Sequence, residues 1–165
     1  MKKSEIHSDD LYPHPSNSDL DVFDLKENST IIVSTSYHKE ITGSMAFSFI
    51  KNSLETLKDI GFIEIPGAFE LPLTIKLIIE KYKPKQVLAL GCIIKGDTKH
   101  DEYLASTVIN GLRNLSLEYK IPIINGVLTT DNLQQAIDRA GKKYDKGRNF
   151  ANASLAMHDI VRKIK

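Results

Sequence analysis

The sequence predicts an α/β fold, a three-layer sandwich in which helices cover both faces of a four-stranded parallel sheet. Short β-branched or apolar runs alternate along the chain with longer segments of helical periodicity, an order typical of β-α-β crossovers. The most hydrophobic run, QVLALGCII (86–94), fits a central strand that is buried on both faces. The length of 165 residues, with 41% hydrophobic and 26% charged residues, fits one globular domain.

The expected elements follow one another without internal repeats. Residues 1–28 are rich in Ser, Asp, Pro and His and are predicted to form a flexible arm, followed by a single domain at 29–165. Gly61 and Gly141 are expected to end helices, and Pro72 fits a helix only in its first turn. Apolar or β-branched runs predict strands at 30–38, 62–66, 86–94 and 121–129. Helical spacing of apolar residues predicts helices at 41–57, 69–83, 100–119, 131–140 and 149–164.

Composition excludes several classes of protein. The chain has 22 basic and 21 acidic residues, so it has no strong field to attract nucleic acid or an anionic membrane. A single cysteine excludes an internal disulfide framework and fits a reducing compartment. There is no signal segment and no apolar run of the roughly 20 residues that span a membrane, so we expect a cytoplasmic protein. No metal-binding or nucleotide-binding motif occurs, so no cofactor is expected.

Polar residues follow the predicted strands, where parallel sheets bind their ligands. The loop after the third strand, at 95–100, is the most informative. Gly96 permits a tight turn, and Thr98 with Asp101 matches a helix-capping pattern. The same amides and hydroxyl could hold a phosphate, provided that the Asp97 amide and not its carboxylate faces the anion. His100 lies in the first helical turn, where the helix dipole favours a neutral imidazole able to accept a proton. The structural alternative is a capped helix start with an exposed histidine.

Other candidate residues each allow a structural and a functional interpretation. Cys92 lies in an apolar strand, and burial there favours a small hydrophobe over a nucleophile. Glu70 either complements a helix dipole or binds sugar hydroxyls, and Arg139 either complements a dipole or binds phosphate. Tyr37 belongs either to the core or to a surface that stacks on a flat ring. Lys95 would form a Schiff base only if it were desolvated, and its glycine neighbour places it in solvent.

Four blocks of sequence together resemble one family closely. They are IPGAFELP (65–72), GCIIKGDTKH (91–100), NGVLTTDNLQQAIDRAG (125–141) and KG (146–147). In order and spacing they are similar to the signature blocks of lumazine synthase, the penultimate enzyme of riboflavin biosynthesis. The likeness runs from about residue 30 to the C-terminus, and it implies a flavodoxin-like strand order.

The resemblance implies a condensation reaction. 5-Amino-6-(D-ribitylamino)uracil joins 3,4-dihydroxy-2-butanone 4-phosphate to give 6,7-dimethyl-8-ribityllumazine, with release of phosphate and water. The Schiff base uses the substrate's own amine, so no enzyme lysine, metal or cofactor is implied.

The resemblance also implies a role for each matching residue. Tyr37 stacks on the pyrimidine, and His100 transfers protons. The residues that match the segment holding the ribityl chain are Ala68, Phe69 and Glu70, and those that match the lining of the pyrimidine pocket are Cys92, Ile93 and Ile94. Asp97 and Thr98 match the phosphate-binding segment. Asn125, Arg139 and Lys146 match positions that the neighbouring subunit supplies, with Arg139 on the phosphate.

The chain departs from the family pattern at a few of these positions. His38 stands where asparagine is usual, Asp101 and Asn125 stand where aromatic residues are common, and YDKG (144–147) replaces GNKG. Family members are pentamers or sixty-subunit capsids, and the absence of an insertion between 139 and 147 favours an icosahedral capsid. Two alternatives are a non-catalytic relative that binds flavin or lumazine or forms a shell, and an unrelated phosphate-binding module. The presence of His100 together with Arg139 argues against the non-catalytic relative.

Overall fold

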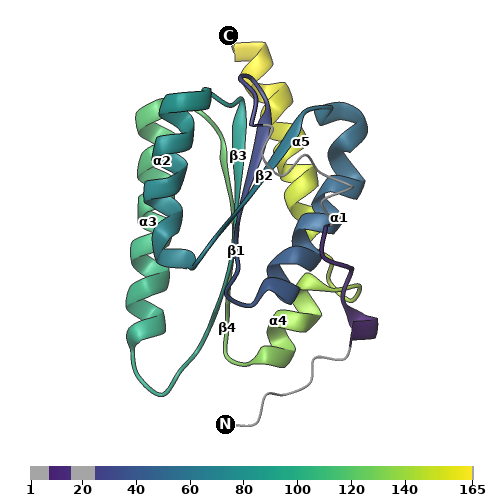
Figure 1. The fold of residues 1–165 in the computed structure, drawn as a ribbon, viewed down its shortest axis with the longest axis vertical. Coiled ribbons are helices and arrows are strands. Elements are labelled where there is room, and N and C mark those ends of the chain that lie inside the picture. The colour runs from purple at the N-terminus through teal and green to yellow at the C-terminus, as the bar shows by residue number, and fades with distance from the viewer. Residues whose placement is uncertain (1–7, 16–24, 165) are drawn as a thin grey trace.

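The protein is described here by a computed structural model that covers residues 8–15 and 25–164 (Figure 1). Four parallel strands form one sheet in the order β2-β1-β3-β4. The strands are β1 (Thr30–Thr35), β2 (Ile60–Ile65), β3 (Gln86–Ile94) and β4 (Ile123–Thr130). The helices are α1 (Lys39–Leu57), α2 (Leu71–Tyr82), α3 (His100–Tyr119), α4 (Leu133–Ala140) and α5 (Lys146–Ile164). The predicted fold class is confirmed, including the flavodoxin-like strand order.

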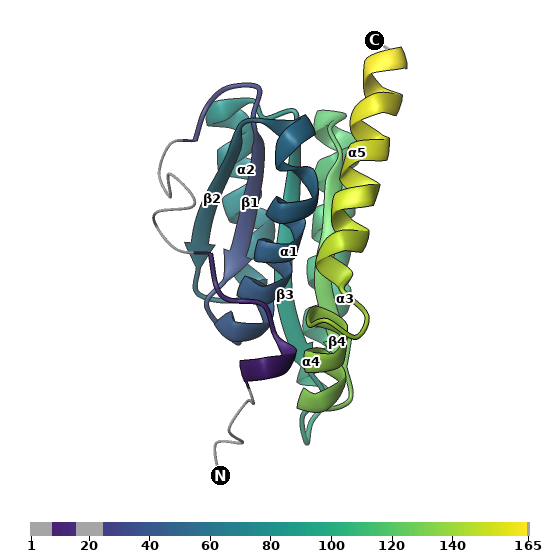
Figure 2. The ribbon, with the colours of Figure 1, turned by 90° about the vertical axis from the view of Figure 1, so that its right-hand side faces the viewer.

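Helices cover both faces of the sheet and form the outer layers. Helices α2 and α3 pack on one face, and α1, α4 and α5 pack on the other (Figures 1 and 2). Successive side chains of β3 enter opposite layers, as the alternation of a strand requires. Those facing α1, α4 and α5 are Leu88, Leu90 and Cys92, and those facing α2 and α3 are Val87, Ala89 and Ile93. The predicted central strand is therefore buried on both faces, over its predicted length.

The predicted helix at 69–83 divides into two parts because of Pro72. Proline has no N–H to donate to Ala68, and the Ala68 carbonyl instead accepts from Leu71, as in a 3₁₀ turn. The structure accordingly has a 3₁₀ turn at Ala68–Glu70, with α2 following from Leu71 and Pro72 in its first turn. The turn keeps the residues after β2 close to the sheet.

The last helix begins at Lys146, earlier than the sequence predicts. Asp145 adopts a left-handed conformation with φ 42°, and its carboxylate accepts a hydrogen bond from the Arg148 amide at 3.2 Å. Gly147 packs against α1, where a Cβ atom would lie 2.5 Å from the Met45 carbonyl oxygen. These contacts form between distant segments, and local periodicity does not reveal them.

Residues 8–15, within the predicted N-terminal arm, contact the α/β layers. A 3₁₀ turn at Ser8–Asp10 precedes Leu11, which is buried in the core beside α1. The His14 ring lies edge-on to Phe62, with its Nε2 3.5 Å from Glu64. Residues 1–7 and 16–24 of the arm lie outside the described residues, and the predicted flexibility stays a prediction. Within the described ranges, no helix combines the length and the apolar character needed to cross a bilayer.

Candidate active site

The loops that follow β1 and β2 are joined by backbone hydrogen bonds. The Ser36 amide donates to Ile65 at 2.7 Å, and the Tyr37 amide donates to Pro66 at 3.2 Å. The Tyr37 side chain is 69% exposed, and its ring packs edge-on against His38 at 4.7 Å. Tyr37 is therefore an exposed aromatic beyond the sheet, available for stacking on a ring, and it does not belong to the core.

The backbone conformation of residue 38 explains why histidine can stand where the family usually has asparagine. His38 precedes α1 in a left-handed conformation, with φ 58° and ψ 45°, and its carbonyl accepts from the Ile41 amide. Asparagine and histidine are both enriched in this conformation, so either residue can end β1 here. Burial lowers the pKa of His38. The strand predicted at 30–38 ends at Thr35, and the left-handed conformation of His38 turns the chain into α1.

The segment after β2 presents one apolar and one charged side chain to solvent. Ala68 is buried beneath the 3₁₀ turn, whereas Phe69 is 67% exposed and Glu70 is also exposed. The turn packs against α3, whose first residue is His100. Candidate residues from the second and third loops therefore lie on neighbouring elements.

The loop after β3 differs in one respect from its prediction. Thr98 is not the N-cap of α3; Lys99 occupies that position, and no side chain caps it. The Thr98 hydroxyl still accepts from the His100 amide at 3.3 Å. The Asp101 carboxylate turns back to accept from the Gly96 amide at 3.3 Å, so the predicted capping box does not form. The Gly96 amide, which could bind an anion, therefore already donates to the Asp101 carboxylate. A phosphate bound to this amide would have to displace that carboxylate.

His100 is exposed at the start of α3, and Asp97 is exposed in the loop before it. In the part of the chain that the structure describes, no side-chain hydrogen bond of His100 is found. Its imidazole is accordingly available to a substrate.

The three residues assigned to a pyrimidine pocket do not share a face of β3. Cys92 points into the layer of α1, α4 and α5, and Ile94 packs at the edge of the same layer. Ile93 points to the opposite layer, beside α3. The side chains of Cys92 and Ile93 therefore face opposite layers of the fold, and Ile93 lines the cleft at the ends of β3 and β4.

Burial raises the pKa of the Cys92 thiol to about 12. The thiol therefore stays protonated at pH 8 to 9, where an ordinary thiol ionises. We expect Cys92→Ala to retain activity close to that of the wild type, with no inflection in the pH–rate profile between pH 8 and 10. Iodoacetamide at pH 8 should modify the native protein slowly and the denaturant-unfolded protein quickly. Loss of activity in Cys92→Ala, with an unchanged circular dichroism spectrum, would contradict this interpretation.

Arg139 lines a cleft of about 440 Å³ at the carboxyl ends of β3 and β4. Its Nη1 donates to the Gln135 carbonyl at 3.3 Å, which leaves other guanidinium donors able to face a ligand. The cleft also contains Lys95, whose backbone amide joins the ends of the two strands by donating to Thr130 at 2.8 Å. The sequence predicts that Lys95 lies in solvent; the residue is exposed, and it lines the same cleft as Arg139. Three carboxylates offset the two cations there, from Asp101, Glu102 and Asp131.

Asn125 and Lys146 lie away from the loops after β1 and β2. Asn125 is level with Ala89 near the start of β4, five residues before the strand ends at Thr130. At about 3.3 Å per residue, its Cα lies roughly 16 Å below that end. Its side chain is exposed on an edge strand and accepts from the Val127 amide. Lys146 is half-buried at the start of α5.

The candidate residues come from two sets of elements in one chain, and Arg139 of the second set shares a cleft with the start of α3. The first, from the ends of β1, β2 and β3, contains Tyr37, Ala68, Phe69, Glu70, Thr98 and His100. The second, from β4, α4 and α5, contains Asn125, Arg139 and Lys146.

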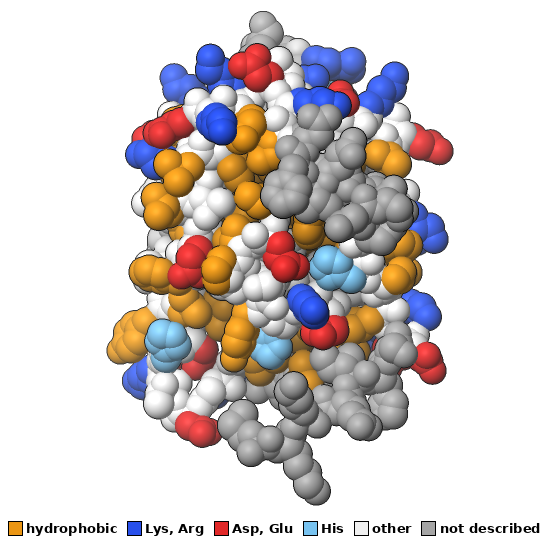
Figure 3. Space-filling view, in the orientation of Figure 1, with side chains coloured by type: hydrophobic (Ala, Val, Ile, Leu, Met, Phe, Trp, Pro, Cys, Tyr) orange, Lys and Arg blue, Asp and Glu red, His pale blue; other side chains and the backbone are white. Residues whose placement is uncertain are grey.

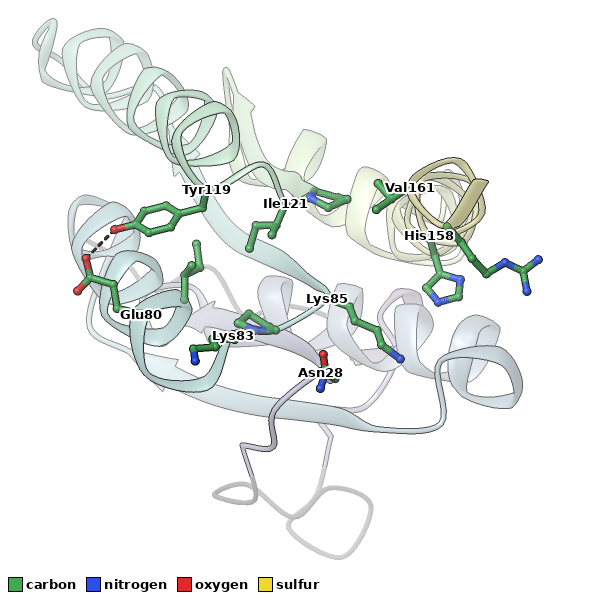
Figure 4. Close-up of a pocket in the computed structure, with 12 residues that line it drawn as sticks. Asn28, Glu80, Lys83, Lys85, Tyr119, Ile121, His158 and Val161 are labelled. Carbon is green, nitrogen blue, oxygen red and sulfur yellow. Dashed lines mark hydrogen bonds between the residues drawn. The ribbon is translucent and has the colours of Figure 1, made fainter. Parts of the chain in front are cut away.

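A larger cavity of about 610 Å³ lies at the opposite end of the sheet (Figure 4). Helices α2, α3 and α5 end there, and the basic side chains around it include Lys83, Lys85 and Arg162. Cations at helix C-termini complement the helix dipoles, which accounts for these residues without a ligand. The cavity holds none of the candidate catalytic residues.

Comparison with known proteins identifies the family. A family model described as 6,7-dimethyl-8-ribityllumazine synthase matches residues 27–162. The chain belongs to the 6,7-dimethyl-8-ribityllumazine synthase family. The family expected from the four sequence blocks is confirmed, and with it the enzyme class, a transferase of riboflavin biosynthesis.

Curated relatives carry the same family name. The lumazine synthase of Prochlorococcus marinus subsp. pastoris is 39% identical over 110 residues, which is 67% of this chain and 70% of the relative. That of Thermococcus gammatolerans is 38% identical over 66% of this chain and 71% of the relative. That of Syntrophus aciditrophicus is 44% identical over 65% of this chain and 70% of the relative. The four sequence blocks that resemble lumazine synthase lie, in this fold, mostly at the carboxyl end of the sheet, with Asn125 the exception.

Proposed function

We propose that this chain condenses 5-amino-6-(D-ribitylamino)uracil with 3,4-dihydroxy-2-butanone 4-phosphate to form 6,7-dimethyl-8-ribityllumazine. The match to the family model over residues 27–162 carries this proposal. The exposed Tyr37, Phe69 and His100, which follow three different strands, support it by providing ring-stacking groups and a proton carrier at one end of the sheet.

The proposed mechanism relies mainly on positioning two substrates. The amine of the ribitylaminouracil attacks the ketone, and loss of one water gives the Schiff base. Elimination of phosphate leaves a carbonyl on the neighbouring carbon, the ribityl-bearing amine attacks it, and loss of a second water closes the ring of the lumazine. Tyr37 stacks on the pyrimidine, and Glu70 with the Ala68–Phe69 segment holds the ribityl chain. Arg139, with the amides around Asp97 and Thr98, binds the phosphate, while His100 transfers protons. Holding two reactants together contributes more to such a reaction than modest acid–base help.

We further propose that the active form is a homo-oligomer with sites shared between subunits. One observation supports this: α2 and the 3₁₀ turn before it carry an exposed apolar stripe. The stripe consists of Phe69, Leu73 and Leu77, exposed by 67%, 65% and 56%. Figure 3 shows hydrophobic side chains exposed over α2 and α3, on the left of the view. Apolar patches of this kind mark association surfaces. A pentamer, or a capsid of sixty subunits, and a cytoplasmic location are parts of the same proposal.

Incubation of the purified protein with both substrates tests the function directly. We expect lumazine to form, as seen by its absorbance and fluorescence, well above the slow uncatalysed background. Treatment with EDTA should leave the rate unchanged. Tight lumazine binding without product formation would favour the non-catalytic alternative and overturn the proposal.

A further inference from the structure

Residues 9–12 contact the turn between α4 and α5 (residues 141–145), far away in the sequence. The Lys142 amide donates to the Asp10 carbonyl at 3.0 Å, and Lys142 Nζ donates to the Asp9 carbonyl at 2.6 Å. Figure 2 shows the 3₁₀ turn that contains Asp9 and Asp10 beside α4. At Gly141 a Cβ atom would lie 2.2 Å from the Asp10 carbonyl oxygen, so only glycine leaves room for this approach. The turn is therefore shaped to receive the N-terminal segment.

Tyr12 joins the segment to both α1 and the turn. Its amide donates to the Ser44 hydroxyl at 3.0 Å, and that hydroxyl donates to the Ala140 carbonyl at the end of α4 at 2.9 Å. Its phenolic hydroxyl donates to the Asp145 carboxylate at 3.2 Å, while its ring stacks on Phe47 with centroids 5.8 Å apart. Burial and the neighbouring Asp145 charge raise the pKa of Tyr12, which keeps the hydroxyl a donor.

The Asp145 carboxylate accepts several hydrogen bonds, and its backbone has a strained left-handed conformation. Besides the Tyr12 hydroxyl, its carboxylate accepts from the Ser48 hydroxyl on α1 and from the Arg148 amide in α5. Its φ of 42° is uncommon for a residue other than glycine and persists when surrounding contacts hold it. Asp145 directly precedes Lys146, and the turn begins shortly after Arg139. The turn thus lies between the two candidate residues at the junction of α4 and α5.

We propose that residues 9–12 form a clamp that fixes the α4–α5 turn and so sets the positions of Arg139 and Lys146, with Tyr12 as a positioning residue. The inference rests on the proposed function for the roles of these two residues. The clamp itself rests only on the contacts above. Because Tyr12 touches no candidate substrate group, its effect on catalysis has to pass through the turn.

Tyr12→Phe removes only the bond to Asp145 and keeps the ring on Phe47. We expect the KM for dihydroxybutanone phosphate to rise about five-fold, the equivalent of one hydrogen bond, while kcat and the KM for the uracil substrate change little. Tyr12→Ala should give the same pattern with a larger rise. Tyr144→Phe is the matched control, because Tyr144 is 54% exposed and its hydroxyl has no hydrogen bond among the described residues.

Amide hydrogen exchange provides a readout that does not depend on activity. The amides of Lys142, Asp145 and Lys146 should exchange faster in Tyr12→Phe than in the wild type. In Tyr144→Phe their exchange rates should equal those of the wild type. Equal exchange in Tyr12→Phe and wild type would overturn the clamp whether or not the wild type is active. Faster exchange at these amides, with an unchanged KM for the phosphate substrate in an active enzyme, would overturn the positioning role of Tyr12. An inactive wild type with the expected exchange pattern would overturn the proposed function and leave the clamp standing.

Discussion

Replacing His100 with alanine is expected to lower kcat by about 10- to 100-fold, at or below the usual range for loss of general acid–base catalysis. His100 is the exposed first residue of α3, and among the described residues no side-chain hydrogen bond holds its imidazole. The two substrates are still held together when the imidazole is removed, so most of the rate enhancement from positioning should survive. Both KM values are accordingly expected to change much less than kcat. Steady-state assays of lumazine formation with each substrate varied in turn measure this.

Two further measurements separate proton transfer from a structural effect. Added imidazole should restore part of the activity of His100→Ala, because it can carry protons in place of the missing side chain. His158→Gln, at the opposite end of the sheet, serves as the control and should retain wild-type kcat. A His100→Ala variant with wild-type kcat would show that the proton carrier is another group or solvent.

The fold could be predicted from sequence because its signals are local. The apolar run of β3 and the apolar spacing of α3 both define elements with the predicted bounds. Errors occur where a distant contact decides the boundary. Helix α5 starts at Lys146 because Asp145 binds residues on α1 and Gly147 packs against Met45, and nothing in the local sequence encodes those partners.

The candidate site could be predicted only in part, for the same reason. The order of strands and loops along the chain shows which polar residues follow a strand. Tyr37 and His100 could be identified as candidates from this order alone. The Asp101 carboxylate accepts from the Gly96 amide and does not form the capping box with Thr98. The same sequence pattern fits both arrangements, so the pattern alone could not distinguish them. The contact between Tyr12 and Asp145 joins residues 133 positions apart, and no spacing rule reaches that far.

Arg139→Ala is expected to raise the KM for dihydroxybutanone phosphate by about 10- to 100-fold, the range for losing a hydrogen bond to a charged group. Arg139 lies in the last turn of α4, with a single guanidinium nitrogen bonded to the Gln135 carbonyl. Arg139→Lys keeps the charge and loses the bidentate geometry, so its KM should lie between those of wild type and alanine. The KM for the uracil substrate is the internal control. An equal rise in both KM values would indicate a general disturbance of the site and contradict a specific phosphate contact.

Mixing two impaired variants, His100→Ala and Arg139→Ala, tests whether Arg139 acts within its own subunit or across an interface. If each site takes His100 from one subunit and Arg139 from its neighbour, random mixing of His100→Ala and Arg139→Ala subunits restores about a quarter of the sites in a ring with head-to-tail contacts. If both residues act in the same subunit, every site keeps one defect and mixing restores nothing. The two variants, unfolded together and refolded at equal concentration, should therefore regain activity at low phosphate-substrate concentration, where either variant alone is nearly inactive. Absence of recovery, in assemblies shown by mass spectrometry to contain both subunits, would place the phosphate site in the cleft of about 440 Å³ within one chain.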